Sequence, residues 1–263
     1  MRLGPRRIAV PEAFSADWLQ RREPFDAAAR ECAATRLRLP ARLAALRPES
    51  TQPWRVIDLA CGTGANMRWL APRLGGAQQW LAVDHDSTLL RCWPVSLAAA
   101  AGTAVRARRR TGLDETLHFS GPGFDAAVLR RQLDLAQRLE ALPWSSAHLV
   151  TASALLDLVS EAWLQRLVAI GAAARAALLF ALSVDGRHRW TPRDPHDAVV
   201  GALFAAHQQR DKGFGRALGA RAAPLLRRAL QDAGYRVHAA NSDWWLDGRS
   251  DARALALLHA MVD

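Results

Sequence analysis

The sequence predicts an α/β protein with a doubly wound, mostly parallel sheet and helices on both faces. A β-branched run ends on Asp58 and turns through Gly62 and Gly64 into a helical stretch. A second apolar run ends on Asp84, twenty residues after Gly64. Further apolar runs follow at spacings that leave room for crossover helices. This alternation is typical of parallel strands joined by helices.

The first part of the chain predicts a helical extension followed by the sheet. Apolar residues recur at helical spacing between Phe14 and Leu46, and Pro24 and Pro40 interrupt them, so we expect two or three short helices within residues 1–52. The stretch 111–125 contains several glycines and a proline and predicts a loop. Within the core (53–183), strands are expected at 54–58 and 78–83, from Val128, from His148 and at 177–183, and helices at 65–74 and 160–170, the latter with Ser160 as N-cap.

After the fifth strand the sequence predicts a long insertion, residues 184–234, within the main domain of 53–263. It contains an expected helix at 196–210 and another at 221–233. We expect a sixth strand at 235–239 and a final helix at 251–262.

The glycine turn and the two acids indicate a nucleoside-binding βαβ unit. Glycines let a backbone approach a ligand that a Cβ would exclude, and an acid such as Asp84 can bind both hydroxyls of a ribose. A dinucleotide fingerprint would place a third glycine at Met67, which is bulky here. Asp58 stands just before the glycines and would repel a pyrophosphate. An anion at that point suits a cationic ligand.

The string Asp58-Leu-Ala-Cys-Gly62-Thr-Gly64 resembles motif I of the class I S-adenosylmethionine-dependent methyltransferases. In that family the acid helps to hold the amino-acid end of the cofactor. Ala60 stands where the family usually has glycine. The resemblance covers roughly residues 50–240, because later segments follow in the family's order.

Those later segments resemble three further motifs. Asp84-His-Asp86 resembles motif II, the turn after the third strand offers Asp134 for the adenine amino group, and the run from His148 to Asp157 resembles motif IV. The resemblance implies S-adenosyl-L-methionine as cofactor. It assigns these residues to cofactor binding: Asp58, Ala60, Gly62, Gly64, Asn66, Asp84, His85, Asp134, Leu135 and Thr151, with Arg22 near the methionine carboxylate.

The acceptor side is less specific. The layout loosely resembles small-molecule methyltransferases of the trans-aconitate type, and it has no Asn-Pro-Pro-Tyr-like string of the enzymes that methylate base amines or glutamine amides. Methyl transfer is an in-line displacement, so a hydroxyl or carbon-acid acceptor also needs a base. Candidates for the base are Asp157 and His207, and the expected acceptor-binding residues are Ser153, Trp190, Gln208, Asp211, Lys212 and Phe214.

Each acceptor-side candidate has a structural alternative. Asp157 could cap a helix, His207 could be a structural histidine, and Asp211 with Lys212 could form an exposed helix end. The N-terminal residues carry a similar choice. Arg22, Asp26 and Arg30 share one helical face with Trp18, which fits either a lid over the cofactor or a solvated row of ion pairs.

The end of the sheet is the main departure from the family. Its members order their strands 3-2-1-4-5-7-6, with strand 7 antiparallel. No seventh strand is evident here, so either 241–246 serves or the sheet is shortened. A shortened sheet would leave unpaired strand edges that invite another chain.

Composition narrows the partners. The net charge is +10, but Lys212 is the only lysine and the basic residues are dispersed apart from 106–110, so we expect no nucleic-acid partner. Cys32, Cys61 and Cys92 form no CxxC pair, and the histidines show no metal spacing; we expect reduced thiols, no metal, no signal peptide, no membrane span and a cytoplasmic location. The oligomeric state, monomer or homodimer, is open. The leading hypothesis is a small-molecule methyltransferase, and the alternatives are an RNA methyltransferase or a catalytically silent binding subunit.

Overall fold

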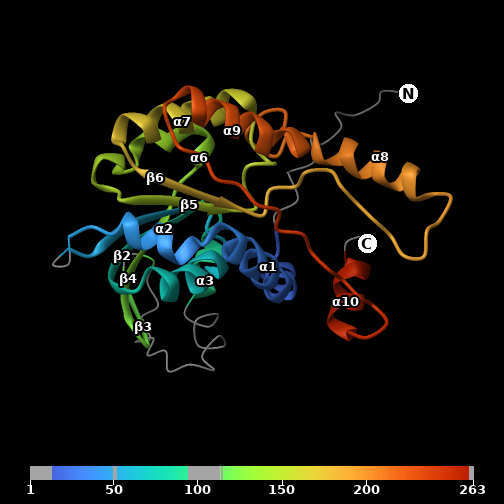
Figure 1. Cartoon of the computed structure of the whole chain (residues 1–263), viewed down its shortest axis with the longest axis horizontal. Helices are drawn as coiled ribbons and strands as arrows, with labels where there is room; N and C mark the ends of the chain where they lie inside the picture. The colour runs from blue at the N-terminus through green and yellow to red at the C-terminus, as the bar shows by residue number, and fades with distance from the viewer. Residues whose placement is uncertain (1–13, 50–51, 94–112, 114, 261–263) are drawn as a thin grey trace, which may run out of the picture.

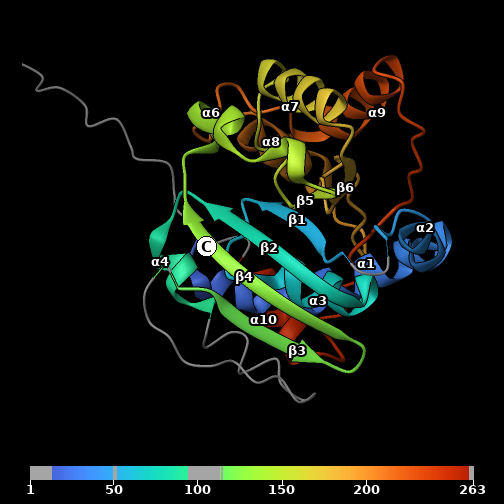
Figure 2. The ribbon, with the colours of Figure 1, turned by 90° about the vertical axis from the view of Figure 1, so that its left-hand side faces the viewer.

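A computed structural model describes residues 14–49, 52–93, 113 and 115–260. It contains one sheet with the strand order β3-β4-β2-β1-β5-β6 (Figures 1 and 2). The five strands from β4 to β6 are parallel, and β3 pairs antiparallel with β4. The strands span Trp54–Leu59 (β1), Gly76–Asp84 (β2), Leu117–Gly121 (β3), Phe124–Gln132 (β4), Leu149–Ser153 (β5) and Ala177–Ala181 (β6).

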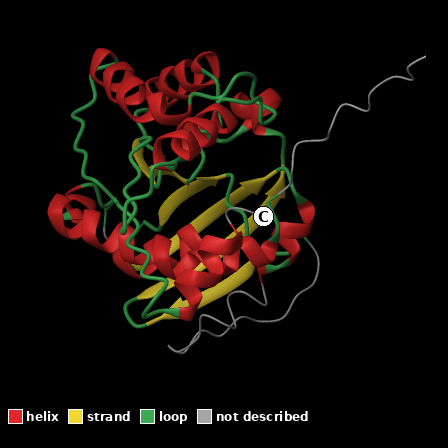
Figure 3. Ribbon diagram, turned by 90° about the vertical axis from the view of Figure 1, so that its right-hand side faces the viewer, coloured by secondary structure: helices red, strands yellow, loops and turns green. Residues whose placement is uncertain are grey.

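Helices cover both faces of this sheet (Figures 2 and 3). On one face lie α1 (Ala16–Leu37), α2 (Leu39–Ala45), α3 (Ala65–Leu74), α4 (Ser87–Arg91) and α10 (Ala252–Ala260). On the other lie α6 (Leu135–Arg138), α7 (Glu161–Ala174) and α9 (Ala222–Asp232), and α8 (Asp197–Gln208) follows on that side. Short 3-10 turns occupy Leu139–Ala141, Trp144–Ser146 and Gly219–Arg221. No helix of the described residues is long and apolar enough to cross a membrane.

Two apolar cores result, one on each face of the sheet. Neighbouring strand residues point to opposite faces, so Val56 packs with Met67 and Leu70 of α3, whereas Ile57 packs with Leu164 and the rest of the α7–α9 side. Strands buried on both faces are mostly apolar, as in β1 and β5. This burial explains the continuous apolar runs in the sequence, and the doubly wound α/β class is confirmed.

Most predicted elements of the core are confirmed. The helix expected at 65–74 has these bounds, and all five parallel strands are present. Ser160 is the N-cap of α7, where its hydroxyl accepts a hydrogen bond from the backbone N–H of Trp163 at 3.4 Å.

The N-terminal prediction was wrong at Pro24. α1 runs unbroken through this proline, which is exposed. The carbonyl of Gln20, which loses its helical donor there, also belongs to an exposed residue, so water can satisfy it. Pro40 instead stands in the first turn of α2, a position that proline tolerates well, after Arg38 in the left-handed conformation.

The loop expected at 111–125 was also wrong in its second half. Residues 117–121 form β3, which returns through a tight turn into β4. Phe119 and Phe124 pack with ring centroids 5.8 Å apart, and Gly123 has a φ of 79° that the turn requires. The glycines and proline mark this hairpin turn. The basic run 106–110 lies outside the described residues.

The sixth strand expected at 235–239 is absent, and 241–246 is not a strand either. The described sheet ends at β6. In the family order, strand 6 pairs only with strand 7, so without strand 7 this segment has no backbone partner. Instead Tyr235 donates its hydroxyl to the carbonyl of Ala176 at 3.1 Å, and the chain continues to α1, where Arg36 donates to the carbonyl of Asn241.

Candidate functional site

Two buried carboxylates lie at one edge of the sheet. Asp58 and Asp84 occupy the carboxyl ends of the adjacent parallel strands β1 and β2, and they are 0% and 4% exposed. Ligands of open α/β sheets bind outside this edge. Burial of a carboxylate is costly without partners, so two of them beside one turn indicate a binding site.

The turn after β1 holds Asp84 in place. Gly62 has a φ of 52°, and its N–H donates to Oδ2 of Asp84 at 2.8 Å. Ala60 also has a positive φ, 50°, where the family usually has glycine. An alanine there is strained by about 1–2 kcal/mol. Alanine at this position therefore adopts a left-handed conformation at an energetic cost.

Gly64 makes room for a tryptophan that the sequence did not mark. A Cβ on Gly64 would lie 2.9 Å from the ring of Trp93, which is fully buried. The Trp93 indole N–H donates to the carbonyl of Gly62 at 2.8 Å. The absence of a Cβ at Gly64 therefore accommodates the Trp93 ring, in addition to any ligand that approaches this backbone. A lone apolar residue after α4 carries no signal that could have predicted the contact.

Asp58 has one satisfied oxygen and one orphan. Its Oδ1 accepts from Nδ2 of Asn66 at 2.8 Å, and the same Nδ2 lies 3.1 Å from Oγ1 of Thr151. Its Oδ2 is buried with no hydrogen-bond partner among the described residues. Burial raises the pKa of Asp58 to about 7, against the lowering effects of the Asn66 hydrogen bond and the Arg30 charge. The carboxyl is thus poised to ionise when a cationic donor reaches Oδ2.

α1 extends this polar network across the site. Arg30 is 3% exposed, and it donates to Oδ1 of Asn66 at 3.2 Å and to the carbonyl of Asp26 at 3.3 Å. Burial lowers the pKa of Arg30 to about 10, so it remains charged near neutral pH. Asn66, at the start of α3, therefore links a charge on α1 to the carboxylate of Asp58.

A second set of contacts fixes α1 to the C-terminal segment. Arg22 forms an ion pair with Asp26 at 2.8 Å, and its guanidinium lies 5.0 Å from the ring centroid of Trp244. The Trp244 indole N–H donates to Asp26 at 3.0 Å. Leu19 lies so close to Gly62 that a Cβ there would be 3.0 Å from its Cδ1. The row of charges on this face of α1 is thus buried or partly buried, and it is not a solvated surface.

The adenine-side candidates stand near Asp84 but are more open. His85 is exposed, and the hydrogen bond that its ring donates to the carboxylate of Asp84 raises its pKa. Asp134 is exposed and caps α6 by accepting from the N–H of Ala136 at 2.8 Å. Leu135 is buried, and its carbonyl accepts from the indole N–H of Trp163 at 2.8 Å.

Asp157, like Asp58 and Glu115, has a buried carboxyl oxygen without a hydrogen-bond partner among the described residues. This oxygen is Oδ1, and burial raises the pKa of Asp157 to about 6 against the lowering effects of backbone N–H groups and of Arg22. It does not cap α7, because Ser160 does. Its loop follows β5, whose last residue, Ser153, is half-buried.

The other acceptor-side candidates lie in the insertion after β6. Asp211 accepts backbone N–H bonds from Gly213 at 2.7 Å and Gly215 at 3.0 Å, so it orders its own loop. Phe214 packs edge-on against Trp163, with ring centroids 5.4 Å apart, and joins the core. These contacts show structural roles for both side chains.

His207 and Gln208 lie in the last turn of α8, which Figure 1 shows at one end of the molecule. His207 is exposed, while Gln208 and Lys212 are half-buried. Trp190 is 38% exposed in the loop before α8. The structure therefore brings Asp58, Asn66, Thr151 and the glycine turn together with Asp84, and it leaves these residues of the insertion outside that cluster.

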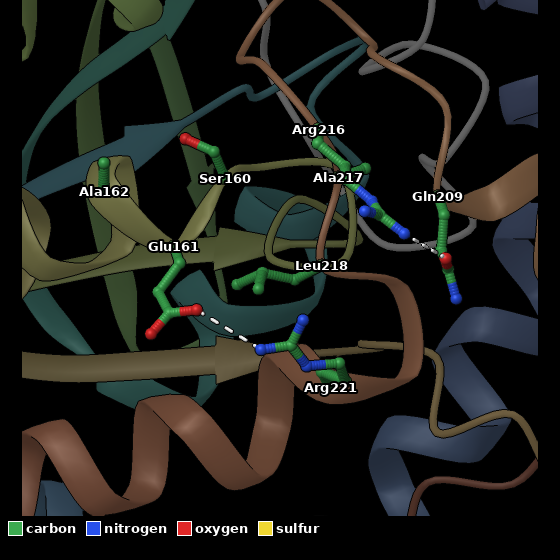
Figure 4. Close-up of a pocket in the computed structure, with 8 residues that line it drawn as sticks. All are labelled: Ser160, Glu161, Ala162, Gln209, Arg216, Ala217, Leu218 and Arg221. Carbon is green, nitrogen blue, oxygen red and sulfur yellow. Dashed lines mark hydrogen bonds and ion pairs between the residues drawn. The ribbon is translucent and has the colours of Figure 1, made fainter.

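A cavity of about 500 Å³ opens between the start of α7 and the loop after α8 (Figure 4), and neither Asp157 nor Asp58 is among its lining residues. Ser160, Glu161 and Gln209 line it with two arginines, of which Arg221 contacts Glu161 at 3.3 Å. Its lining residue Leu218 donates a backbone hydrogen bond to Val159 at 2.9 Å, and the next residue, Gly219, donates to the carbonyl of Asp157 at 2.9 Å. These backbone bonds hold the loop of Asp157 to the segment that follows the lining residue Leu218.

No family model and no curated relative matches the chain. Among solved structures, it is similar to an S-adenosylmethionine dependent methyltransferase from Mesorhizobium loti (20% identity, TM-score 0.43), covering 84% of this chain and 91% of that one. It is also similar to an O-methyltransferase family protein from Burkholderia thailandensis (16% identity, TM-score 0.42), covering 77% of this chain and about half, 52%, of that one. An arsenic(III) S-adenosylmethionine methyltransferase from Chlamydomonas reinhardtii matches at 17% identity and a TM-score of 0.40, covering 72% and 54%.

Proposed function

We propose that this chain binds S-adenosyl-L-methionine at the carboxyl ends of β1 and β2 and transfers its methyl group to a small-molecule acceptor. One observation carries the proposal. Two adjacent parallel strands end in buried carboxylates on either side of a glycine turn, and one of these carboxylates, Asp58, keeps a buried oxygen without a partner. A buried orphan of this kind indicates a ligand group that completes it.

The two carboxylates suit different parts of that cofactor. The ammonium of its methionine end is the cationic donor that Asp58 Oδ2 lacks. The carboxylate of Asp84 already accepts backbone N–H bonds from Gly62 and, at 2.9 Å, from Asp86. These two bonds fix the orientation of the carboxylate. A carboxylate has about four acceptor sites, and His85 takes a third one in this structure, so Asp84 can accept one ribose hydroxyl directly and the second when the exposed His85 ring turns away. His85 and Asp134 stand on the side where the adenine would lie.

α1 acts as a lid in this proposal. Leu19 and Arg30 now pack against Gly62 and Asn66, and neither described cavity is lined by Asp58, Gly62 or Asp84. α1 therefore moves away to admit the cofactor and closes again to exclude water. Arg22 or Arg30, both on the face of α1 turned toward the site, would then meet the methionine carboxylate.

On the acceptor side we assign the base to Asp157. The bound cofactor supplies an electrophilic methyl group on a sulfonium. Asp157 takes the proton from a hydroxyl or carbon-acid acceptor, and its raised pKa of about 6 suits this transfer near neutral pH. The cavity lined by Ser160 and Leu218, whose neighbours in the chain bond to the loop of Asp157, has a volume of about 500 Å³, within the range of small-molecule sites. His207 is exposed on α8, so Asp157 is the better candidate of the two.

The direct test is a methyl-transfer assay with cofactor labelled on the methyl group. Purified protein is incubated with a metabolite extract and, separately, with total RNA, and the label is followed into each fraction. Label in a small-molecule product with wild type, and none with Asp157→Asn, supports the proposal. Label only in RNA would favour the RNA methyltransferase, and cofactor binding with no transfer in any fraction would favour a silent binding subunit.

A further inference from the structure

The middle of α8 is apolar on every side and yet uncovered. Residues 198–206 read Ala-Val-Val-Gly-Ala-Leu-Phe-Ala-Ala, without one polar side chain. None of the helix is buried, and Val199, Val200 and Leu203 are 58%, 48% and 67% exposed. Figure 1 shows the helix projecting beyond the rest of its layer.

Within the part of the chain that the structure describes, one side of this helix packs on the rest of the molecule. The ring of Phe204 packs edge to face against the ring of His188, with ring centroids 5.2 Å apart. Gly201 and Ala205, on the same side of the helix, are half-buried. Val199, Leu203 and Ala206 lie at the spacing of one helical stripe on the opposite side, with Val200 beside them. A helix that is apolar all round is normally buried, and a helix of 12 residues has little stability of its own in water. The exposed stripe therefore indicates an interface.

We propose that this stripe pairs with the same stripe of a second copy, the two α8 helices lying antiparallel across a two-fold axis. The ends of the helix are complementary in charge for that arrangement. The start carries Asp194 and Asp197 together with Arg193, a net charge of −1, and the end is followed by Arg210, Asp211 and Lys212, a net charge of +1. Antiparallel packing brings the acidic start of each helix to the basic end of the other, at two symmetry-related places, as an isologous interface requires.

The sizes of the side chains also match. With the axis between residues 202 and 203, Leu203 of each copy faces Ala202 of the other, and Val199 faces Ala206. Large side chains then meet small ones, so the two backbones can approach closely. A parallel pair would instead place acid against acid at one end and Arg210 against Arg210 at the other. This charge pattern selects the antiparallel copy over the parallel one.

The pair buries a modest area. Standard protein–protein interfaces bury about 1,200–2,000 Å² in total, and two helices of this length supply less. We therefore expect a dimer that dissociates on dilution, with a dissociation constant on the order of micromolar. This inference does not depend on the proposed methyltransferase activity, and it names the surface for an oligomeric state that the sequence leaves open.

Sedimentation velocity across a hundredfold range of concentration tests it. The full chain should shift from monomer to dimer with rising concentration, and Leu203→Glu should remain monomeric throughout. Leu255→Glu is the matched control, because Leu255 is also an exposed leucine, 42% on α10, and its replacement should leave the dimer intact. Circular dichroism and a thermal scan of both variants show that each is folded.

A cysteine cross-link tests the register. In a Cys32→Ser background, Leu203→Cys next to the axis should give a disulfide-linked dimer on mild oxidation, whereas Arg193→Cys, well away from the axis, should not. Wild type that stays monomeric at every concentration overturns the proposal. If that monomer binds lipid vesicles, the stripe is a membrane contact and not a dimer interface. A dimer that survives Leu203→Glu also overturns it and would place the interface elsewhere, for example at the open edge of β6.

Discussion

The pKa of Asp58 predicts that removing its charge stabilises the protein in a pH-dependent way. Burial raises this pKa from 3.8 to about 7, so the folded state holds a proton that the unfolded state releases. Stability from this group is greatest at low pH and is lost as the pH rises toward and through about 7. Between about pH 5 and pH 8 the loss is roughly two pH units at 1.36 kcal/mol each, or about 3 kcal/mol.

Asp58→Asn removes this titration and keeps an oxygen that can accept from Asn66. The free energy of unfolding of the variant relative to wild type should therefore rise by about 3 kcal/mol between about pH 5 and pH 8. At pH 5 we expect the variant to be equal or less stable, since its amide leaves donors unsatisfied at a cost of about 1–3 kcal/mol.

Urea unfolding at the two pH values measures this double difference, and the other titrating groups cancel between the two proteins. Asp125→Asn is the control, because Asp125 is an exposed carboxylate near the amino end of β4. The change with pH should be larger for Asp58→Asn than for this control. The electrostatics assigned to Asp58 would be wrong in two cases. The first is a free-energy difference between Asp58→Asn and wild type that stays the same at both pH values within about 0.5 kcal/mol. The second is a variant that is less stable relative to wild type at pH 8 than at pH 5.

Three further predictions test the surroundings of the site. Gly64→Ala should lower the free energy of unfolding by about 1–3 kcal/mol more than Gly123→Ala does. Both glycines have a positive φ, but a Cβ added at Gly64 would lie 2.9 Å from the Trp93 ring, whereas nothing lies within 4 Å at Gly123. Equal shifts of the melting temperature in the two variants would contradict the clash. Arg30→Met should lose about 2–3 kcal/mol of unfolding free energy through its buried hydrogen bonds, whereas the exposed Arg36→Met stays within about 0.5 kcal/mol, and similar losses in both would count against the network. Asp157→Asn should lower turnover by about 10²–10⁴-fold with unchanged cofactor affinity, and wild-type turnover should rise with pH through about 6; a flat pH profile would remove Asp157 as the base.

The predictable part of the fold is the part that local patterns determine. α3 follows from glycines before an apolar helical pattern, and the parallel strands follow from apolar runs that both faces of the sheet require. The start of α7 follows from Ser160, because an N-cap acts through bonds within one turn. These signals lie within a few residues of the structure that they specify.

The failures depend on distant contacts. Pro24 predicts a break, but α1 continues because Asp26 and Arg30, two and six residues later, are buried against Trp244 and Asn66. The segment 235–239 has a strand-like composition, but a strand needs a backbone partner, and here the sheet ends at β6. Neither outcome can be read from the neighbouring sequence.

The candidate site divides in the same way. Asp58, Gly62 and Asp84 could be predicted because each immediately ends a strand or forms the turn after it. Asp211 could not be interpreted from sequence, since a carboxylate in a polar loop fits either a substrate contact or a turn, and its bonds to Gly213 and Gly215 show the turn. The role of Trp93 depends on packing against a residue far away in the chain, which no local pattern encodes.

The most direct test of the central claim is a calorimetric titration of S-adenosyl-L-methionine into wild type, Asp84→Asn and Asp125→Asn. Charge-assisted hydrogen bonds contribute about 1.5–3 kcal/mol each, so Asp84→Asn should weaken binding by about ten- to a hundredfold. Asp125→Asn should bind as wild type does. Wild type that binds no cofactor, or an Asp84→Asn variant that binds with unchanged affinity, would contradict the assignment of this sheet edge as the cofactor site.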